Sequence, residues 1–162
     1  MESQKKLIAL IVAFLSEIGI EVRLEPLTEN TILPGINVDH GTLVIDEMKL
    51  KYPGDLLHEA GHIAVVPSDR RKRLHRNVGQ RAHEEMLAIA WSYAAAVHLG
   101  LAADVVFHPE GYRGGSQSLI ENFTSGHYFG VSTLAWLGMT NEPGKSKSTG
   151  STYPRMRKWL LD

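Results

Sequence analysis

The chain has 162 residues, of which 43% are hydrophobic and 22% are charged, a composition typical of one folded domain around a single core. A formal net charge of −1 argues against general binding to nucleic acid or to an anionic membrane surface, so neither is an expected partner. The absence of cysteine excludes disulfides and thiolate metal sites and agrees with a cytoplasmic protein. We therefore predict one domain over residues 1–162 and a cytoplasmic location.

An apolar run, LIALIVAFL, follows the charged start MESQKK and allows two interpretations. A secretory signal has this charge and this apolar core, but no small-residue cleavage site follows the run, and Ser16 and Glu17 interrupt it. About 14 apolar-rich residues are also too few to span a bilayer. We predict a buried N-terminal helix that ends near Glu17, and no membrane partner.

Residues 20–27 alternate apolar and charged side chains, which is the period of a half-buried strand. Short strand patterns at 32–33 and 36–38 lead to a tight turn at 39–41 and then to a further strand, Thr42–Asp46. Because helical patterns dominate the remaining chain, we predict an α+β fold: an N-terminal helix, a small mostly antiparallel sheet and then a helical portion. Thr42–Asp46 is a candidate edge strand for an extended peptide substrate, with plain sheet structure as the alternative.

The motif HEAGH, from His58 to His62, lies in the apolar run DLLHEAGHIAVV, which predicts a buried helix with Asp55 as its cap. Histidines four residues apart lie on the same face of a helix and can bind one metal ion. Glu59 lies beside this pair, where a carboxylate can act as general base toward a water on the metal. The alternative is an ordinary helix whose two histidines are hydrogen-bonded.

A catalytic zinc site needs a third protein ligand. The next long helical pattern runs from Arg81 to about Leu99, and its first turn carries Glu84 and Glu85, which lie 22 and 23 residues after His62. Since neighbours in a helix point about 100° apart, only one of these two glutamates can face the metal. The spacing alone leaves both open.

With His58, Glu59, His62 and a glutamate at the start of a long helix, the chain resembles the gluzincin-type zinc metallopeptidases. The resemblance runs from His58 to roughly Leu99 and is strongest to small bacterial members, including regulatory peptidases that cut repressor proteins. The related branch with the motif HExxHxxGxxH is excluded, because valine and serine stand at its last two conserved positions, 65 and 68.

The resemblance implies a zincin-like fold and a Zn²⁺ ion bound by His58, His62 and Glu85, with Glu84 as the alternative third ligand. Glu85 is favoured because the ligand in this family is typically followed by a small or apolar residue, here Met86. Glu59 is then the general base for hydrolysis of a peptide or protein substrate. Manganese, cobalt or nickel suit the same ligands.

Two loops carry further polar candidates. His108 and Tyr112, in the turn-rich stretch HPEGYRGG, are candidates for stabilising the oxyanion of a tetrahedral intermediate, with bonding to nearby backbone as the alternative. His127 and Tyr128 form a second pair of this kind and rank lower. Residues 140–152 are polar, and we predict a flexible segment there.

Six basic residues lie between positions 70 and 81, and no aromatic residues alternate with them, which favours a solvated connection over a nucleic-acid site. The competing functional class is a non-catalytic metal-binding or regulatory protein on the same fold. Glu59 argues against it, because a purely structural zinc site has no use for a carboxylate beside an open position. The sequence does not predict the oligomeric state.

Overall fold

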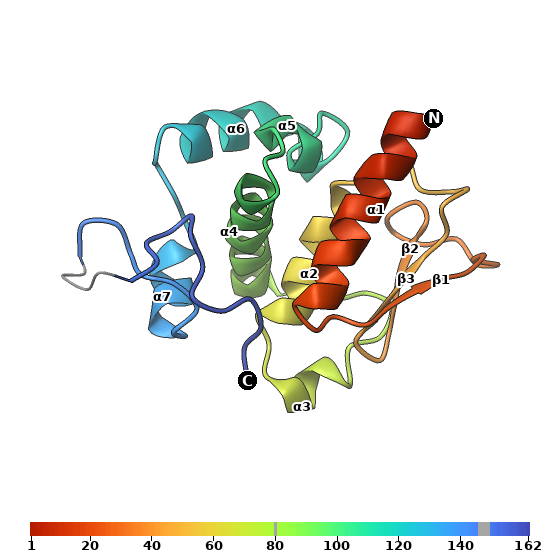
Figure 1. Ribbon diagram of the computed structural model, residues 1–162, viewed down its shortest axis with the longest axis horizontal. Coiled ribbons are helices and arrows are strands. Elements are labelled where there is room, and N and C mark those ends of the chain that lie inside the picture. Colours follow the sequence, from red (N-terminus) through yellow and green to blue (C-terminus); the bar gives the residue numbers. More distant parts are fainter. Residues whose placement is uncertain (80, 146–149) are drawn as a thin grey trace.

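A computed structural model describes residues 1–79, 81–145 and 150–162 and shows an α+β fold. Helix α4 runs through the middle of the molecule, with α1 and α2 between it and a three-stranded sheet, α5 and α6 across its C-terminal end, and α7 on its other side (Figure 1). The elements in chain order are α1 (Glu2–Glu17), β1 (Val22–Leu24), β2 (Ile36–Asp39), β3 (Thr42–Ile45), α2 (Asp55–Ala64), α3 (Ser68–Arg71), α4 (Ala82–His98), α5 (Ala103–Val106), the 3₁₀ turn η1 (Tyr112–Gly114), α6 (Ser116–Thr124) and α7 (Val131–Trp136).

The sheet is mixed, with the strand order β1-β3-β2. β3 pairs in parallel with β1 and antiparallel with β2, so the predicted mostly antiparallel sheet was only half right. The prediction that Thr42–Asp46 forms a sheet edge was wrong, because β3 is the central strand and both of its sides are paired. All four β3 residues are buried, as expected of a short apolar strand covered on both faces. β2 is the outer strand that lies near the HEAGH helix, because Ile36 and Asn37 line the same cavity as His58 and Glu59.

The two helices that carry the predicted ligands pack closely against each other. Gly61 of α2 faces Ala88 of α4, and a Cβ atom added at Gly61 would lie only 2.9 Å from the Ala88 carbonyl oxygen. Gly54, just before α2, is as tightly enclosed, since an added Cβ would lie 1.8 Å from the Val105 carbonyl oxygen. Gly61 therefore allows α2 to approach α4 closely, which brings the HEAGH face next to the first turn of α4, and Gly54 allows the start of α2 to approach α5 (Ala103–Val106).

The helix predictions are confirmed for α1, α2 and α4, whose bounds agree with the apolar patterns. The predicted cap of α2 was wrong: Gly54 precedes the helix without a side-chain cap, and the Asp55 carboxylate contacts His108 instead. The physical reason is that Asp55 is buried, and a buried carboxylate needs a hydrogen-bond partner, which His108 supplies. Among the described residues, no helix combines the length and apolar character that crossing a bilayer requires.

The C-terminal residues cover the junction of α2 and α4 without forming a helix. Trp91 donates its indole N–H to the Trp159 carbonyl at 3.0 Å, and the Leu161 amide donates to the Ala64 carbonyl at 2.9 Å. Within the segment predicted to be flexible, Thr140 is buried and Asn141 bridges to Thr152. Residues 146–149 of that segment lie outside the described part of the chain.

Tyr153 links this C-terminal part to α4, because its buried hydroxyl donates to the Ala90 carbonyl at 2.7 Å. We expect Tyr153→Phe to lower the free energy of unfolding by about 1 kcal/mol at pH 7. Burial also raises the pKa of Tyr153 well above its usual value, so the wild type should lose stability as the pH rises above about 10, where the tyrosine of the unfolded chain ionises. Urea unfolding at pH 7 and above pH 10 tests this: the difference between the two proteins should shrink at the higher pH, and a constant difference would contradict it.

Candidate metal centre

Helix α2 presents both histidines of the motif to the first turn of α4. The His58 and His62 rings lie edge to face with their centroids 5.0 Å apart. Their Nε2 atoms meet one carboxylate, that of Glu85: His62 Nε2 lies 2.7 Å from Oε2, and His58 Nε2 lies 3.0 Å from Oε1. The structure therefore brings together the three side chains that the sequence proposed as metal ligands.

Glu84 points elsewhere. Its carboxylate lies 2.5 Å from Arg70 Nη1 and 3.8 Å from Arg81 Nη1, both in or beside the basic segment that precedes α4. Burial by itself raises the pKa of Glu84, but the hydrogen bond with Arg70 and the nearby positive charges outweigh burial and lower it. The two neighbouring glutamates thus have separate partners, and only Glu85 contacts the histidines.

The electrostatics of the centre follow from these contacts. Burial raises the pKa of Glu85, yet the hydrogen bonds with His58 and His62 outweigh burial and bring that pKa far below its usual value. Burial lowers the pKa of His58, and the hydrogen bond with Glu85 outweighs it, so the net shift is upward. Glu85 is therefore held as a carboxylate, the charge state that a metal ligand needs.

The donor set fits a zinc ion. Two imidazole nitrogens and one carboxylate are zinc ligands, and three protein ligands leave a fourth position open for chemistry. Ligand atoms about 2.0–2.1 Å from a tetrahedral metal lie roughly 3.3 Å from one another, so the 2.7 and 3.0 Å contacts require only a small separation of these side chains. Behind the ligands, the Tyr112 hydroxyl lies 3.3 Å from His58 Nδ1, while His62 Nδ1 is buried without a partner among the described residues.

Glu59 occupies the side of α2 next to this centre. One carboxylate oxygen of Glu59 and one ring nitrogen each of His58 and His62 all lie within 4.8 Å of one another. Glu59 also lines a cavity of about 400 Å³ whose opposite wall comes from residues 29–33 and 76–79. Burial raises the pKa of the Glu59 carboxyl above its usual value. This is where a general base would be expected beside an open metal position.

A second cavity of about 530 Å³ adjoins the first, and His58 and Glu85 line both. His108 and Tyr112 line this second cavity. His108 stacks on Tyr52 at 4.0 Å, and its Nε2 lies 2.6 Å from Asp55 Oδ1. Burial raises the pKa of Asp55 more than the hydrogen bond with His108 lowers it. The candidate centre therefore lies at the boundary of the two cavities.

The predicted oxyanion donors thus have defined contacts. The Tyr112 hydroxyl contacts the nitrogen of His58 that does not face Glu85, and His108 Nε2 is engaged by Asp55, so the oxyanion role of both stays a prediction. The lower-ranked pair lines neither cavity: His127 is exposed and bonded to Ser125, and Tyr128 packs on Tyr153. Sequence reasoning missed the pairing of Asp55 with His108, which no pattern across 53 residues indicates.

Tyr112 supports a prediction of its own. A phenol that receives the Nδ1 proton of His58 fixes the tautomer in which Nε2 can bind a metal, and loss of such an outer contact typically costs 10–100-fold in metal affinity. We expect Tyr112→Phe to weaken zinc binding by about tenfold. Tyr128→Phe, a matched change in the same aromatic cluster, should leave zinc affinity unaltered. Competition titration against a chromophoric chelator measures both, and equal affinities in all three proteins would rule out this role for Tyr112.

Comparisons of the chain with protein-family models, with curated proteins and with solved structures gave no match. Interpretation of the centre therefore depends on the side chains described above: their donor atoms, their distances and the cavities beside them.

Proposed function

We propose that this protein is a zinc-dependent metallopeptidase of gluzincin type with a zincin-like fold. The observation that carries the proposal is the single Glu85 carboxylate in contact with Nε2 of both His58 and His62, at the edge of a cavity lined by Glu59. In an ordinary core helix separate nearby groups would satisfy the two histidines, whereas here one carboxylate from another helix contacts both beside a cavity, which supports a metal site. The open side of the donor set favours catalysis over a structural metal site.

When bound, zinc supplies a Lewis acid that polarises a carbonyl and lowers the pKa of water from 15.7 to about 7. His58, His62 and Glu85 would hold the ion. Glu59 would accept the proton of the attacking water and deliver it to the leaving amine, which is the work of a general acid–base group.

Tyr112 and His108 would act from the second cavity. Tyr112 lies closer to the centre, because its hydroxyl already contacts His58, and in this proposal it positions that ligand and lies near the oxyanion. His108 bonds to Asp55 and stacks on Tyr52, so the proposed role of His108 is to support that wall and to donate to the substrate only if its ring rotates.

The substrate path would follow β2 and not β3. Ile36 and Asn37 of this outer strand line the same cavity as Glu59, so an extended peptide pairing with the start of β2 would reach the centre. The end of β2 is already covered, since the Arg76 amide donates to the Val38 carbonyl at 2.7 Å. An extended segment of a peptide or protein is therefore the proposed substrate class.

A cleavage assay tests this function. Wild-type protein loaded with one equivalent of zinc is incubated with a library of unstructured peptides, and new chain termini are identified by mass spectrometry. Cleavage that stops after treatment with a chelator and returns on adding zinc supports the proposal. If zinc is bound and no peptide in the library is cut, the non-catalytic metal-binding alternative gains support.

A further inference from the structure

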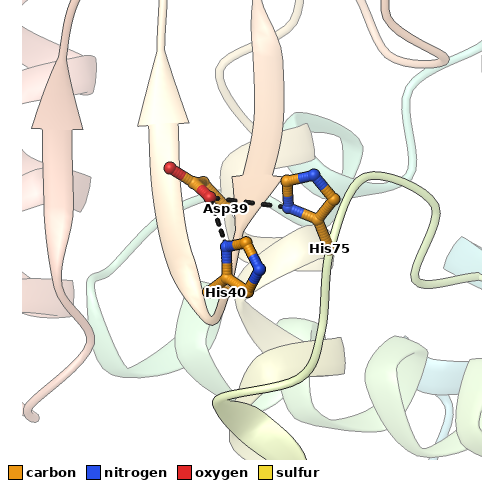
Figure 2. A group of neighbouring side chains, drawn as sticks. All are labelled: Asp39, His40 and His75. Atoms are coloured by element: carbon orange, nitrogen blue, oxygen red, sulfur yellow. Dashed lines mark hydrogen bonds and ion pairs between the residues drawn. The ribbon is translucent and has the colours of Figure 1, made fainter.

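A second group of metal-binding side chains lies apart from the HEAGH centre. Figure 2 shows Asp39, at the end of β2, with His40 in the β2–β3 turn and His75 in the segment that leads toward α4. One ligand atom from each of the three lies within 4.8 Å of the others. Both imidazole Nδ1 atoms face the same carboxylate oxygen of Asp39, at 2.6 Å for His40 and 3.5 Å for His75. Donors from two separate parts of the chain thus converge on one point.

The backbone holds this arrangement in place. His40 and Gly41 both have positive φ angles, 50° and 86°, which form the tight turn between β2 and β3. The Gly41 amide donates to the Leu74 carbonyl at 3.0 Å, and Asp39 forms an isolated bridge with His75. The turn and the segment around His75 are therefore joined by main-chain hydrogen bonds, which hold the three side chains close together before any metal binds.

Arg23 of β1 organises the carboxylate. Its Nη2 lies 2.8 Å from Oδ2 of Asp39, which leaves Oδ1 toward the two histidines. The hydrogen bonds from Arg23 and His40 lower the pKa of Asp39 to about 2, so the group is ionised at neutral pH. The positive charge of Arg23 and the exposure of both imidazoles also predict a weaker site than the buried HEAGH centre.

We propose that Asp39, His40 and His75 form a second metal site, which binds Zn²⁺ or a similar first-row divalent cation more weakly than the HEAGH centre. Two imidazoles and a carboxylate suit zinc, nickel or copper, whereas calcium and magnesium prefer sites built from oxygen. The 3.5 Å between His75 Nδ1 and Asp39 Oδ1 is close to the roughly 3.3 Å edge of a tetrahedral zinc site. Asp39 and His75 also line an open hollow of about 250 Å³, so a cation can reach them.

Metal binding at this cluster would affect the neighbouring cavity. Arg76–Gly79, directly after His75, form part of the wall of the cavity that Glu59 lines. A cation shared by the β2–β3 turn and His75 would fasten the start of that wall to the sheet. Because a metal that binds only the folded state adds RT ln(1 + [L]/Kd) to stability, occupation should also raise the melting temperature.

The test is zinc stoichiometry by equilibrium dialysis on three full-length proteins. His40→Asn combined with His75→Gln removes both imidazoles, and asparagine tolerates the positive φ at position 40. We expect this double variant to bind one zinc fewer than the wild type, while the control His127→Asn, which removes an exposed histidine outside the cluster, binds the same number. Equal stoichiometry and affinity in all three proteins would overturn the proposal. The comparison holds whether or not the HEAGH centre binds zinc.

A second measurement does not depend on any variant. Long-range ¹H–¹⁵N spectra of the imidazoles follow each histidine of the wild type as zinc is added. The proposal expects the signals of His40 and His75 to shift together, at zinc concentrations above those that affect His58 and His62. Signals of His40 and His75 that stay unchanged up to a large excess of zinc would contradict it.

Discussion

Glu85→Ala should reduce the zinc affinity of this protein by more than the 10–100-fold typical of losing an outer contact, because it removes a proposed metal ligand itself. Glu84→Ala should leave zinc affinity essentially unchanged, although the two residues are adjacent. The reason lies in their partners: Glu85 contacts Nε2 of both motif histidines, and Glu84 contacts Arg70. Competition titration with a chromophoric chelator gives the affinity of each protein, with the wild type as reference.

These two variants control for each other, since each removes one carboxylate from the first turn of α4. Glu84→Ala breaks the ion pair with Arg70 and so tests whether a disturbed α4 alone weakens the centre. Circular dichroism of both variants checks that the helices are retained. Similar losses of affinity in both, or a loss confined to Glu84→Ala, would contradict the assignment of Glu85.

Glu59→Gln should lower kcat/KM for peptide hydrolysis by about 10²–10⁴-fold and leave zinc affinity close to that of the wild type. Glutamine keeps the shape of the side chain but cannot accept the proton of the attacking water. Glu59 lies near the histidine pair, but the carboxylate that contacts their Nε2 atoms is that of Glu85, so the metal should stay bound. Activity is measured on a peptide that the wild type cuts, with metal content determined on the same samples.

The matched control is Glu29→Gln, which makes the same change in the wall of the same cavity, away from the histidine pair. This variant should keep activity within a few-fold of the wild type, since Glu29 is exposed and its ion pair with Arg76 is long, at 3.8 Å. Full activity in Glu59→Gln would remove the proposed general base. An equal loss in both variants would indicate an effect of cavity charge instead.

The helical part of the fold could be predicted because its apolar patterns are long and periodic. The apolar run around HEAGH predicted α2, and the run of apolar residues after Glu85 predicted α4. The pairing of His58, His62 and Glu85 needed one further fact, namely which of two adjacent glutamates faces α2. Spacing left that choice open, and the close contact of Gly61 with Ala88 sets the relative position of the two helices.

The sheet was harder to predict, because strand order depends on contacts between distant residues. The β2–β3 hairpin shows in the sequence as a turn with His40 and Gly41, yet the parallel pairing of β1 with β3 leaves no local signal. For that reason β3 was mistaken for an edge. A short apolar strand such as β3 is typical of a central position, and this signal was present in Leu43–Ile45.

The proposed second metal site shows the same limit. His75 lies in a basic stretch that favours a solvated connection by its composition, and His40 lies in a turn 35 positions earlier. Main-chain contacts between the β2–β3 turn and the segment around His75, including the bridge between Asp39 and His75, bring these residues together. Asp55 and His108 are a similar case, since each has a plausible local role, as a cap and as a loop residue, until the fold joins them.

The zinc content of the wild-type protein tests the proposed centre most directly. The protein is purified without added metal or chelator, dialysed against zinc-free buffer to empty weak sites, and measured by atomic emission. We predict one zinc ion per chain for the wild type and for Glu84→Ala, and essentially none for Glu85→Ala. A wild-type protein that contains no zinc, and takes up none at the HEAGH centre from micromolar zinc, would contradict the account and leave HEAGH as a core helix with two buried histidines.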